Sequence, residues 1–73
     1  MLVMRNTNKY LKSVVKLVNH KLERSGSTKV LLSSRENGYY YIRDNKNNLC
    51  HGGDSPKGCI TFLRGIECAL DKN

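Results

Sequence analysis

Apolar side chains recur every three or four residues between positions 10 and 22, which is the spacing of one buried helical face. This stripe consists of Tyr10, Leu11, Val14, Val15, Val18 and Leu22. Asn6, Thr7 or Asn8 can cap the start of the predicted helix with a side-chain oxygen. We expect the helix to end near Gly26 and to carry a mostly basic outer face.

Residues 29–43 predict a β-hairpin around Asn37-Gly38. The turn has two interpretations: a two-residue type I′ turn at Asn37-Gly38, or a three-residue loop, Glu36-Asn37-Gly38, closed by Gly38 in the left-handed region. The two registers differ by one residue. Such a shift moves every side chain of one strand to the opposite face of the sheet.

In the two-residue register, Leu32 shares a face with Tyr39 and Tyr41, and neither face is uniform in polarity. The three-residue register separates the residues cleanly. It gathers on one side Val30, Leu32, Tyr40 and Ile42, and on the other side Lys29, Leu31, Ser33, Arg35, Tyr39, Tyr41 and Arg43. The segregated pattern favours the three-residue loop.

A second helix is predicted after Ser55, which can cap it, because Pro56 suits the first helical position. Its apolar side comprises Cys59, Phe62, Leu63, Ile66, Ala69 and Leu70. A row of small residues lies beside it, namely Gly58, Thr61, Gly65 and Cys68. Since glycine weakens a helix interior, Gly65 requires either a compensating close contact or a tolerated weak helix. Our hypothesis is that the first helix crosses this row closely.

Between the hairpin and the second helix, the Asn-rich residues 44–48 predict a turn, and Leu49-Cys50-His51 predicts a third strand ending at Gly52-Gly53. We therefore expect one α+β domain over residues 1–73, with residues 1–5 as a flexible tail. Its three-stranded antiparallel meander packs both helices on one face, an αβββα order that leaves the other face open.

The net charge of the chain indicates which classes of partner to expect. Thirteen Lys and Arg residues against six Asp and Glu give a formal charge of +7 among 73 residues, which favours nucleic acids, acidic proteins or anionic surfaces. A merely soluble basic surface is the alternative. Arg5 interrupts the first apolar residues before they reach the length of a signal peptide, so we expect a cytoplasmic protein without membrane contact. Three cysteines fit reduced thiols.

The open face is the strongest candidate for function. We expect it to present tyrosines among cations, helped by lysines of the two helices. These candidate binding residues are Leu31, Arg35, Tyr39, Tyr41, Arg43, Lys9, Lys12, Lys16 and Lys57. Aromatic rings and cations can stack bases and hold phosphates, but they also mark protein interfaces. A protein partner, a nucleic acid and a homodimer all remain open.

Catalytic and metal signatures are weak. Cys50, His51 and Cys59 lack the spacing of zinc ligands, so we expect no metal or cofactor. The glycine-rich residues 52–58 lead into a helix N-terminus beside Lys57, but they do not have P-loop spacing. His51 near a strand end leaves ribonuclease activity as a minor alternative, and we expect no enzyme.

The element order resembles that of double-stranded-RNA-binding domains and of the small ribonuclease toxins that share their fold. The loop Glu36-Asn37-Gly38 and the helix start Pro56-Lys57-Gly58-Cys59 stand where those domains carry their RNA-binding motifs, and only Lys57 is carried over as a phosphate contact. In size and composition, the chain is similar to small phage-encoded inhibitors of host enzymes, including anti-CRISPR proteins. An architecture alone does not transfer activity. From the open face, we expect a non-catalytic protein that docks on a nucleic-acid-handling protein or complex. The second resemblance implies an inhibitor of a host defence system encoded by a phage or mobile element, and direct RNA or DNA binding is the alternative.

Overall fold

The chain folds in the order helix, three strands, helix, as its apolar pattern predicts. A computed structural model describes residues 8–72, so the candidate caps Asn6 and Thr7 and the tail at residues 1–5 lie outside the described residues. The elements are α1 (Asn8–Arg24), β1 (Leu31–Glu36), β2 (Tyr39–Asp44), β3 (Leu49–Gly53) and α2 (Pro56–Asp71). The strands form an antiparallel meander with β2 in the centre.

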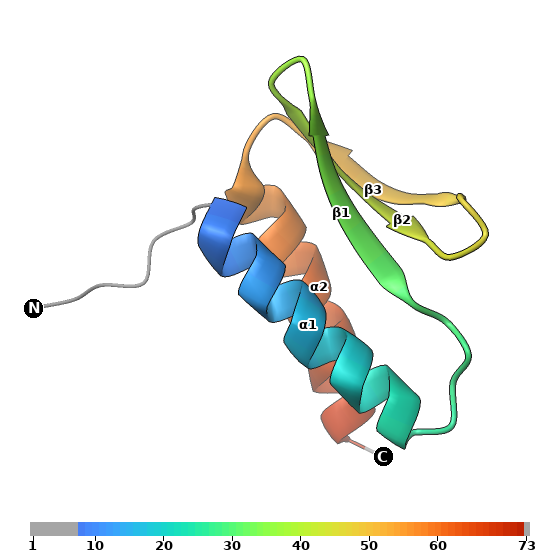
Figure 1. Ribbon diagram of the computed structural model, residues 1–73. Coiled ribbons are helices and arrows are strands. Elements are labelled where there is room, and N and C mark those ends of the chain that lie inside the picture. Colours follow the sequence, from blue (N-terminus) through green and yellow to red (C-terminus); the bar gives the residue numbers. More distant parts are fainter. Residues whose placement is uncertain (1–7, 73) are drawn as a thin grey trace, which may run out of the picture.

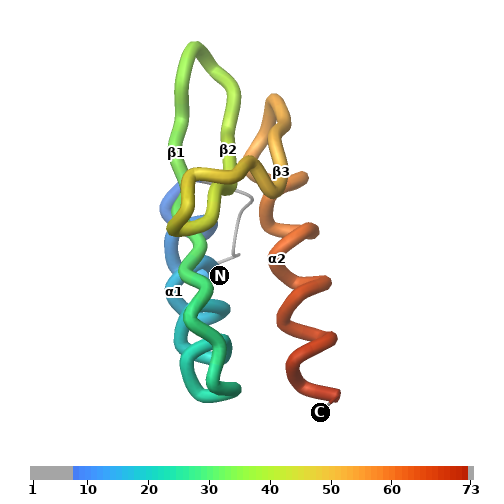
Figure 2. Tube along the Cα trace, turned by 90° about the vertical axis from the view of Figure 1, so that its right-hand side faces the viewer, coloured from blue at the N-terminus to red at the C-terminus, as the bar shows by residue number. Residues whose placement is uncertain are grey.

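Both helices cover the same face of the sheet and run in the same direction (Figures 1 and 2). α1 packs against α2 and β1, whereas α2 packs against β2 and β3. The buried core combines side chains of both helices with two from the sheet: Leu11, Val14, Val15, Val18, Leu22, Leu31, Ile42, Cys59, Ile60 and Leu63. The expected two-layer α+β fold is therefore confirmed.

α1 is terminated by a glycine, as predicted. Gly26 adopts a left-handed φ of +88°, which costs glycine little. Its N–H donates to the Glu23 carbonyl at 3.0 Å, and the Ser27 N–H donates to the Leu22 carbonyl at 3.0 Å. These two bonds form a Schellman motif and satisfy carbonyls that the helix leaves unpaired.

The hairpin adopts the register that the sequence pattern did not favour. Glu36 pairs with Tyr39, so the turn contains two residues, Asn37 and Gly38, with φ of +52° and +82°. Positive φ at both central positions is the requirement of a type I′ turn, whose twist matches that of the strands. The prediction of a three-residue loop was wrong, because it weighted side-chain segregation above the preference of Asn-Gly for this turn.

The correction affects only β1. Tyr40 and Ile42 face the helices as predicted, and Ile42 is fully buried. In β1 the predicted positions are exchanged, because Leu31 is 2% exposed and Leu32 is 55% exposed. Val30 precedes β1 and is also exposed rather than part of the core.

Two asparagine side chains hold the entry to β1 in place of neighbouring strands. The Asn19 amide in α1 accepts from the Leu31 N–H at 2.7 Å and donates to the Leu31 carbonyl at 2.8 Å. On the other side, the Asn45 amide accepts from the Val30 N–H at 3.3 Å and donates to the Thr28 carbonyl at 3.1 Å. Both sides of the backbone are therefore satisfied before the hairpin begins.

The turn from β2 to β3 is organised by Asp44, which is 8% exposed. Its carboxylate accepts from the backbone N–H groups of Asn48 and Lys46, both at 2.9 Å, while Asn47 takes a left-handed φ of +68°. The hydrogen bond from Asn48 is the largest cause of a pKa below the ordinary value for an aspartate. The predicted turn chemistry is thus confirmed.

β3 joins the sheet with an irregularity. Ile42 pairs with His51 and Arg43 with Leu49, so Cys50 lies outside the regular pairing. The His51 ring faces the helices and stacks on Phe62 of α2, with centroids 5.2 Å apart.

α2 begins as predicted, with Ser55 as N-cap residue and Pro56 first in the helix, although the Ser55 side chain makes no capping hydrogen bond. Ile60 is buried although it was not predicted, and Ala69 is exposed although it was.

The row of small residues on α2 is not crossed by α1. Gly65 is exposed, and a Cβ placed on it would meet nothing within 4 Å. The predicted close crossing was wrong, because the helices pack through their buried stripes and leave Gly65 facing solvent.

We expect Gly65→Ala to raise the free energy of unfolding by about 0.5–1 kcal/mol, because alanine restricts the unfolded chain and meets no obstacle in the helix. Thermal unfolding should show a midpoint about 2–8 °C higher. Gly38→Ala is the matched control, because its left-handed φ should make the same substitution destabilising by about 1 kcal/mol or more. A lower midpoint for Gly65→Ala would contradict the packing described.

The Asp44 carboxylate should make stability depend on pH in acid. Because folding lowers its pKa, its stabilising contribution is complete above the unfolded-state value of about 3.9 and is lost as the pH falls through the folded-state value. Urea unfolding should therefore show the stability of the wild type approaching that of Asp44→Asn as the pH falls below about 4. Other carboxylates titrate in both proteins, so a constant gap between the two curves would contradict this role.

Candidate functional site

The face of the sheet turned away from the helices forms the candidate site, here called the open face. By strand alternation and pairing it holds Leu32, Ser34, Glu36, Tyr39, Tyr41, Arg43, Leu49 and Gly52. Figure 1 shows both helices on the opposite side of the sheet. Among the described residues, no helix covers this face.

A row of three side chains crosses the open face from one edge to the other. Arg43 in the central strand pairs with Leu32 on one side and with Leu49 on the other. Leu32 is 55% and Leu49 58% exposed. Two exposed leucines flanking a cation form an amphipathic strip, and exposed apolar groups gathered on one face are typical of binding surfaces.

Beside this row, Tyr41 contacts both Arg43 and the neighbouring strand β3. The Arg43 guanidinium lies 4.9 Å from the centroid of the Tyr41 ring, and its Nη1 donates to Ser34 Oγ at 3.4 Å. The Tyr41 ring also lies over Gly52, where a Cβ would stand 3.3 Å from its Cδ1. Cation–π contact and the close glycine thus hold Tyr41 and Arg43 in place before any partner binds. Tyr39, nearer the turn, is 52% exposed.

Two predicted members of the site lie elsewhere. Leu31 is buried in the core, and Arg35 lies on the helix-side face of the hairpin, 5.4 Å from the Tyr40 ring centroid. Their places on the open face are taken by Leu32 and Glu36. The prediction missed Leu32 and Leu49, and the Asn37-Gly38 turn was the signal that could have revealed Leu32.

The corrected register changes the charge of the open face. The prediction placed two arginines there, Arg35 and Arg43, together with Lys29. The structure leaves Arg43 and adds Glu36, so the two formal charges cancel. The surface is consequently aromatic and apolar rather than strongly basic.

The predicted lysines lie apart from the open face. Lys9, Lys12 and Lys16 are exposed on α1, in the helical layer behind the sheet, and Lys57 is exposed in the first turn of α2. The basic surface and the aromatic surface are therefore two separate regions of the molecule.

Part of the positive charge is neutralised between the helices. Lys21 Nζ lies 2.9 Å from carboxylate oxygens of both Glu67 and Asp71, and Arg64 lies 2.6 Å from Glu67. The hydrogen bonds to Asp71 and Glu67 raise the pKa of Lys21, and those from Arg64 and Lys21 lower the pKa of Glu67. The Lys21 contacts join the two helices, whereas the Arg64–Glu67 pair lies within α2.

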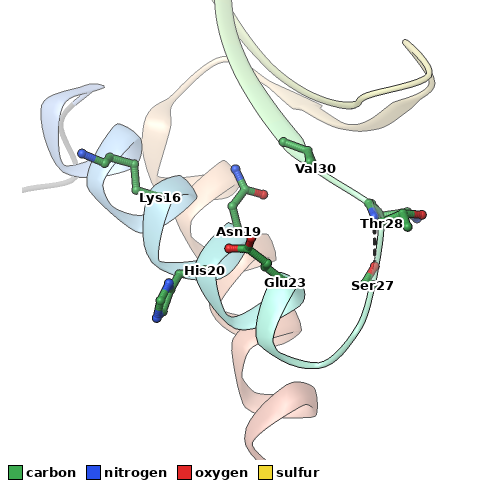
Figure 3. Close-up of a pocket in the computed structure, with 8 residues that line it drawn as sticks. Lys16, Asn19, His20, Glu23, Ser27, Thr28 and Val30 are labelled. Atoms are coloured by element: carbon green, nitrogen blue, oxygen red, sulfur yellow. Dashed lines mark hydrogen bonds between the residues drawn. The ribbon is translucent and has the colours of Figure 1, made fainter.

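A shallow groove of about 550 Å³ lies between the second half of α1 and residues 27–30 (Figure 3). In Figure 3, Asn19 points from α1 toward the strand, with Glu23 beside it and Lys16 and His20 on the outer side of the helix. Lys29 and Val30 complete the groove. The groove is open, and its lining mixes polar and apolar groups and ends at Val30, just before β1.

The cysteines and histidines are dispersed. Within residues 8–72, no group of three His, Cys, Asp or Glu side chains is arranged to hold a metal ion. Cys50, Cys59 and Cys68 are free thiols, and burial raises the pKa of Cys59. No described helix is both long and apolar enough to cross a membrane.

No family model, curated protein or solved structure matches this chain. The fold and the chemistry of its surfaces are therefore the grounds for a functional conclusion.

Proposed function

We propose that the chain is a small non-catalytic binding protein that docks through its open face on a protein partner. The observation that carries the proposal is the set of exposed Leu32, Tyr39 and Leu49 around the ordered Tyr41–Arg43 pair. Aromatic residues and arginine are enriched at protein interfaces, and buried aromatic anchors dominate their binding energy.

The charge of the open face supports a protein partner over a nucleic acid. A surface that binds phosphates needs several cations, because neutralising phosphates supplies most of that affinity. The open face offers Arg43 together with the opposing charge of Glu36. Apolar contacts from Leu32 and Leu49 suit a partner that has an apolar patch of its own.

The outer lysines of α1 connect the partner with nucleic acid. With Lys9, Lys12 and Lys16 behind the sheet and a formal charge of +7, the chain can dock on a protein while its helical layer approaches phosphates. This combination suits a cytoplasmic nucleic-acid-handling complex. An inhibitor of a host defence system encoded by a phage or mobile element, of the anti-CRISPR kind, is the role that we propose within that class.

Direct RNA or DNA binding is the second candidate. It is favoured by the exposed lysines of α1 and by the αβββα element order, which resembles that of double-stranded-RNA-binding domains. Lys57 would be its carried-over phosphate contact. This function predicts an affinity that falls steeply with salt, because each neutralised phosphate releases counterions.

A small ribonuclease is the third candidate and rests on His51 alone. The His51 ring stacks on Phe62, and its Nε2 lies 3.4 Å from where a Cβ of Gly58 would stand. These contacts give His51 a packing role. Undiminished RNA cleavage by His51→Ala would exclude a ribonuclease site at His51, on which this candidate rests.

Variants of the open face should separate the first two candidates. We expect the double variant Tyr39→Ser and Leu49→Ser to bind its protein partner at least about 30-fold more weakly. The loss of a buried anchor residue typically costs about 2 kcal/mol of binding free energy. The chain would be used to capture its partner from host extract, with and without nuclease, and the affinity for the identified protein would then be measured.

The matched control replaces Lys9, Lys12 and Lys16 with glutamine, which should cost less than about tenfold in affinity for the protein. Docking through the open face would be contradicted by three results together: nuclease abolishes capture, the lysine variant loses binding, and the open-face variant keeps it. That result would favour direct nucleic-acid binding.

A further inference from the structure

The outer edge of β1 exposes backbone groups in a regular alternation. β1 is an edge strand, and its two-residue turn and pairing direct the N–H and C=O groups of Leu32, Ser34 and Glu36 toward β2. Those of Leu31, Ser33 and Arg35 must then point away from the sheet. The hydrogen bonds of Asn45 to Thr28 and Val30, on the β2 side, follow the same alternation.

The chain itself demonstrates that this edge accepts a strand-like partner. Asn19 presents one carbonyl and one amide N–H to Leu31, at 2.7 and 2.8 Å, as a neighbouring strand would. This strand-like contact is limited to Leu31. Among residues 8–72, no side chain or backbone group takes the outward N–H and C=O of Ser33 or Arg35. In Figure 1, the end of β1 at the turn extends beyond the start of α1.

The charges along this edge are positive on balance. Arg35 lies on the strand, and Lys16 and Lys29 line the groove that also contains Asn19. Lys12 lies two helical turns before Asn19 on the same flank of α1. The carboxylates near these cations are Glu23 in the groove, Glu36 at the strand end and Asp44 near Lys29, so four cations face three anions.

We infer that the outer edge of β1 at Ser33 and Arg35 binds an extended acidic segment of a protein partner by adding a strand to the sheet. Backbone hydrogen bonds supply the affinity in this mode of recognition, and alternate side chains supply the specificity. Residues beside Arg35 would be acidic, and those beside Leu32 on the open face would be apolar. The inference rests on the proposed docking function and defines a second contact for it.

A second copy of the chain is the competing occupant. Two β1 edges could pair, but each copy carries a formal charge of +7, and the repulsion opposes association. An acidic segment is attracted by the same positive charge. The charge therefore selects the acidic partner.

The test uses the full chain and two synthetic peptides of about ten residues, one alternating Glu and Val and one alternating Lys and Val. Amide hydrogen exchange followed by NMR should show Ser33 and Arg35 exchanging quickly in the free protein, and Leu31 slowly. The Glu peptide should slow Ser33 and Arg35 at least about tenfold, and the Lys peptide should not. This readout needs no variant.

Substitutions then locate the peptide. Ser33→Pro removes the outward N–H and should weaken binding about tenfold, whereas Ser33→Ala keeps the N–H and the affinity. Arg35→Gln should weaken binding about three- to tenfold. Leu49→Ser, at the far side of the open face, should leave peptide binding unchanged, which separates this site from the open face.

Three results would overturn the inference: equal protection by both peptides, unprotected Ser33 and Arg35 amides at saturating Glu peptide, or binding lost in Leu49→Ser but kept in Ser33→Pro. Amides that are already protected in the free protein would do the same. If that protection rose with concentration while the sedimenting mass doubled, the occupant would be a second copy. Docking of a protein on the open face is measured separately and can survive any of these outcomes.

Discussion

The two-residue turn at Asn37-Gly38 is the constraint that determines both the open face and the exposed edge of β1. Left-handed φ at both positions closes a type I′ turn, and the turn fixes Glu36 opposite Tyr39. Every later pair in the hairpin is then determined. Leu31 enters the core, while Leu32 joins Tyr39 and Arg43 outside.

The same register determines the chemistry of the molecule. It moves Arg35 behind the sheet and brings Glu36 forward, so that the open face carries cancelling charges among apolar and aromatic groups. It also directs the backbone groups of Leu31 toward α1, where Asn19 satisfies them. One turn therefore determines the composition of the open face, the side of the sheet on which Arg35 lies and the partly occupied edge of β1.

Most of the fold could be predicted from the sequence because its signals are local. The stripe of α1, the glycine at its end, the Asn-rich turn after β2 and the Ser55-Pro56 start of α2 each depend on residues within a few positions. The face of β1 could not be predicted as safely, because Leu31 and Leu32 are adjacent and equally apolar. Only the turn distinguishes them, and overall segregation of polarity gave the wrong answer.

The site was accordingly predicted in part. Tyr39, Tyr41 and Arg43 lie on the open face as expected, since the orientation of β2 is the same in both registers. The role of Gly65 depended on how the helices cross, which the spacing of small residues does not specify. The bidentate contact of Asn19 with Leu31 joins residues 12 positions apart and left no sequence signal.

The register itself is tested most directly by NMR, through the cross-strand contacts between backbone Hα protons of the hairpin. In an antiparallel sheet these protons lie closest in the pairs that are not hydrogen-bonded to each other. The account predicts a strong nuclear Overhauser effect between Ser33 and Ile42. A strong effect between Leu32 and Ile42 in its place would show the three-residue loop and would remove the open face described here.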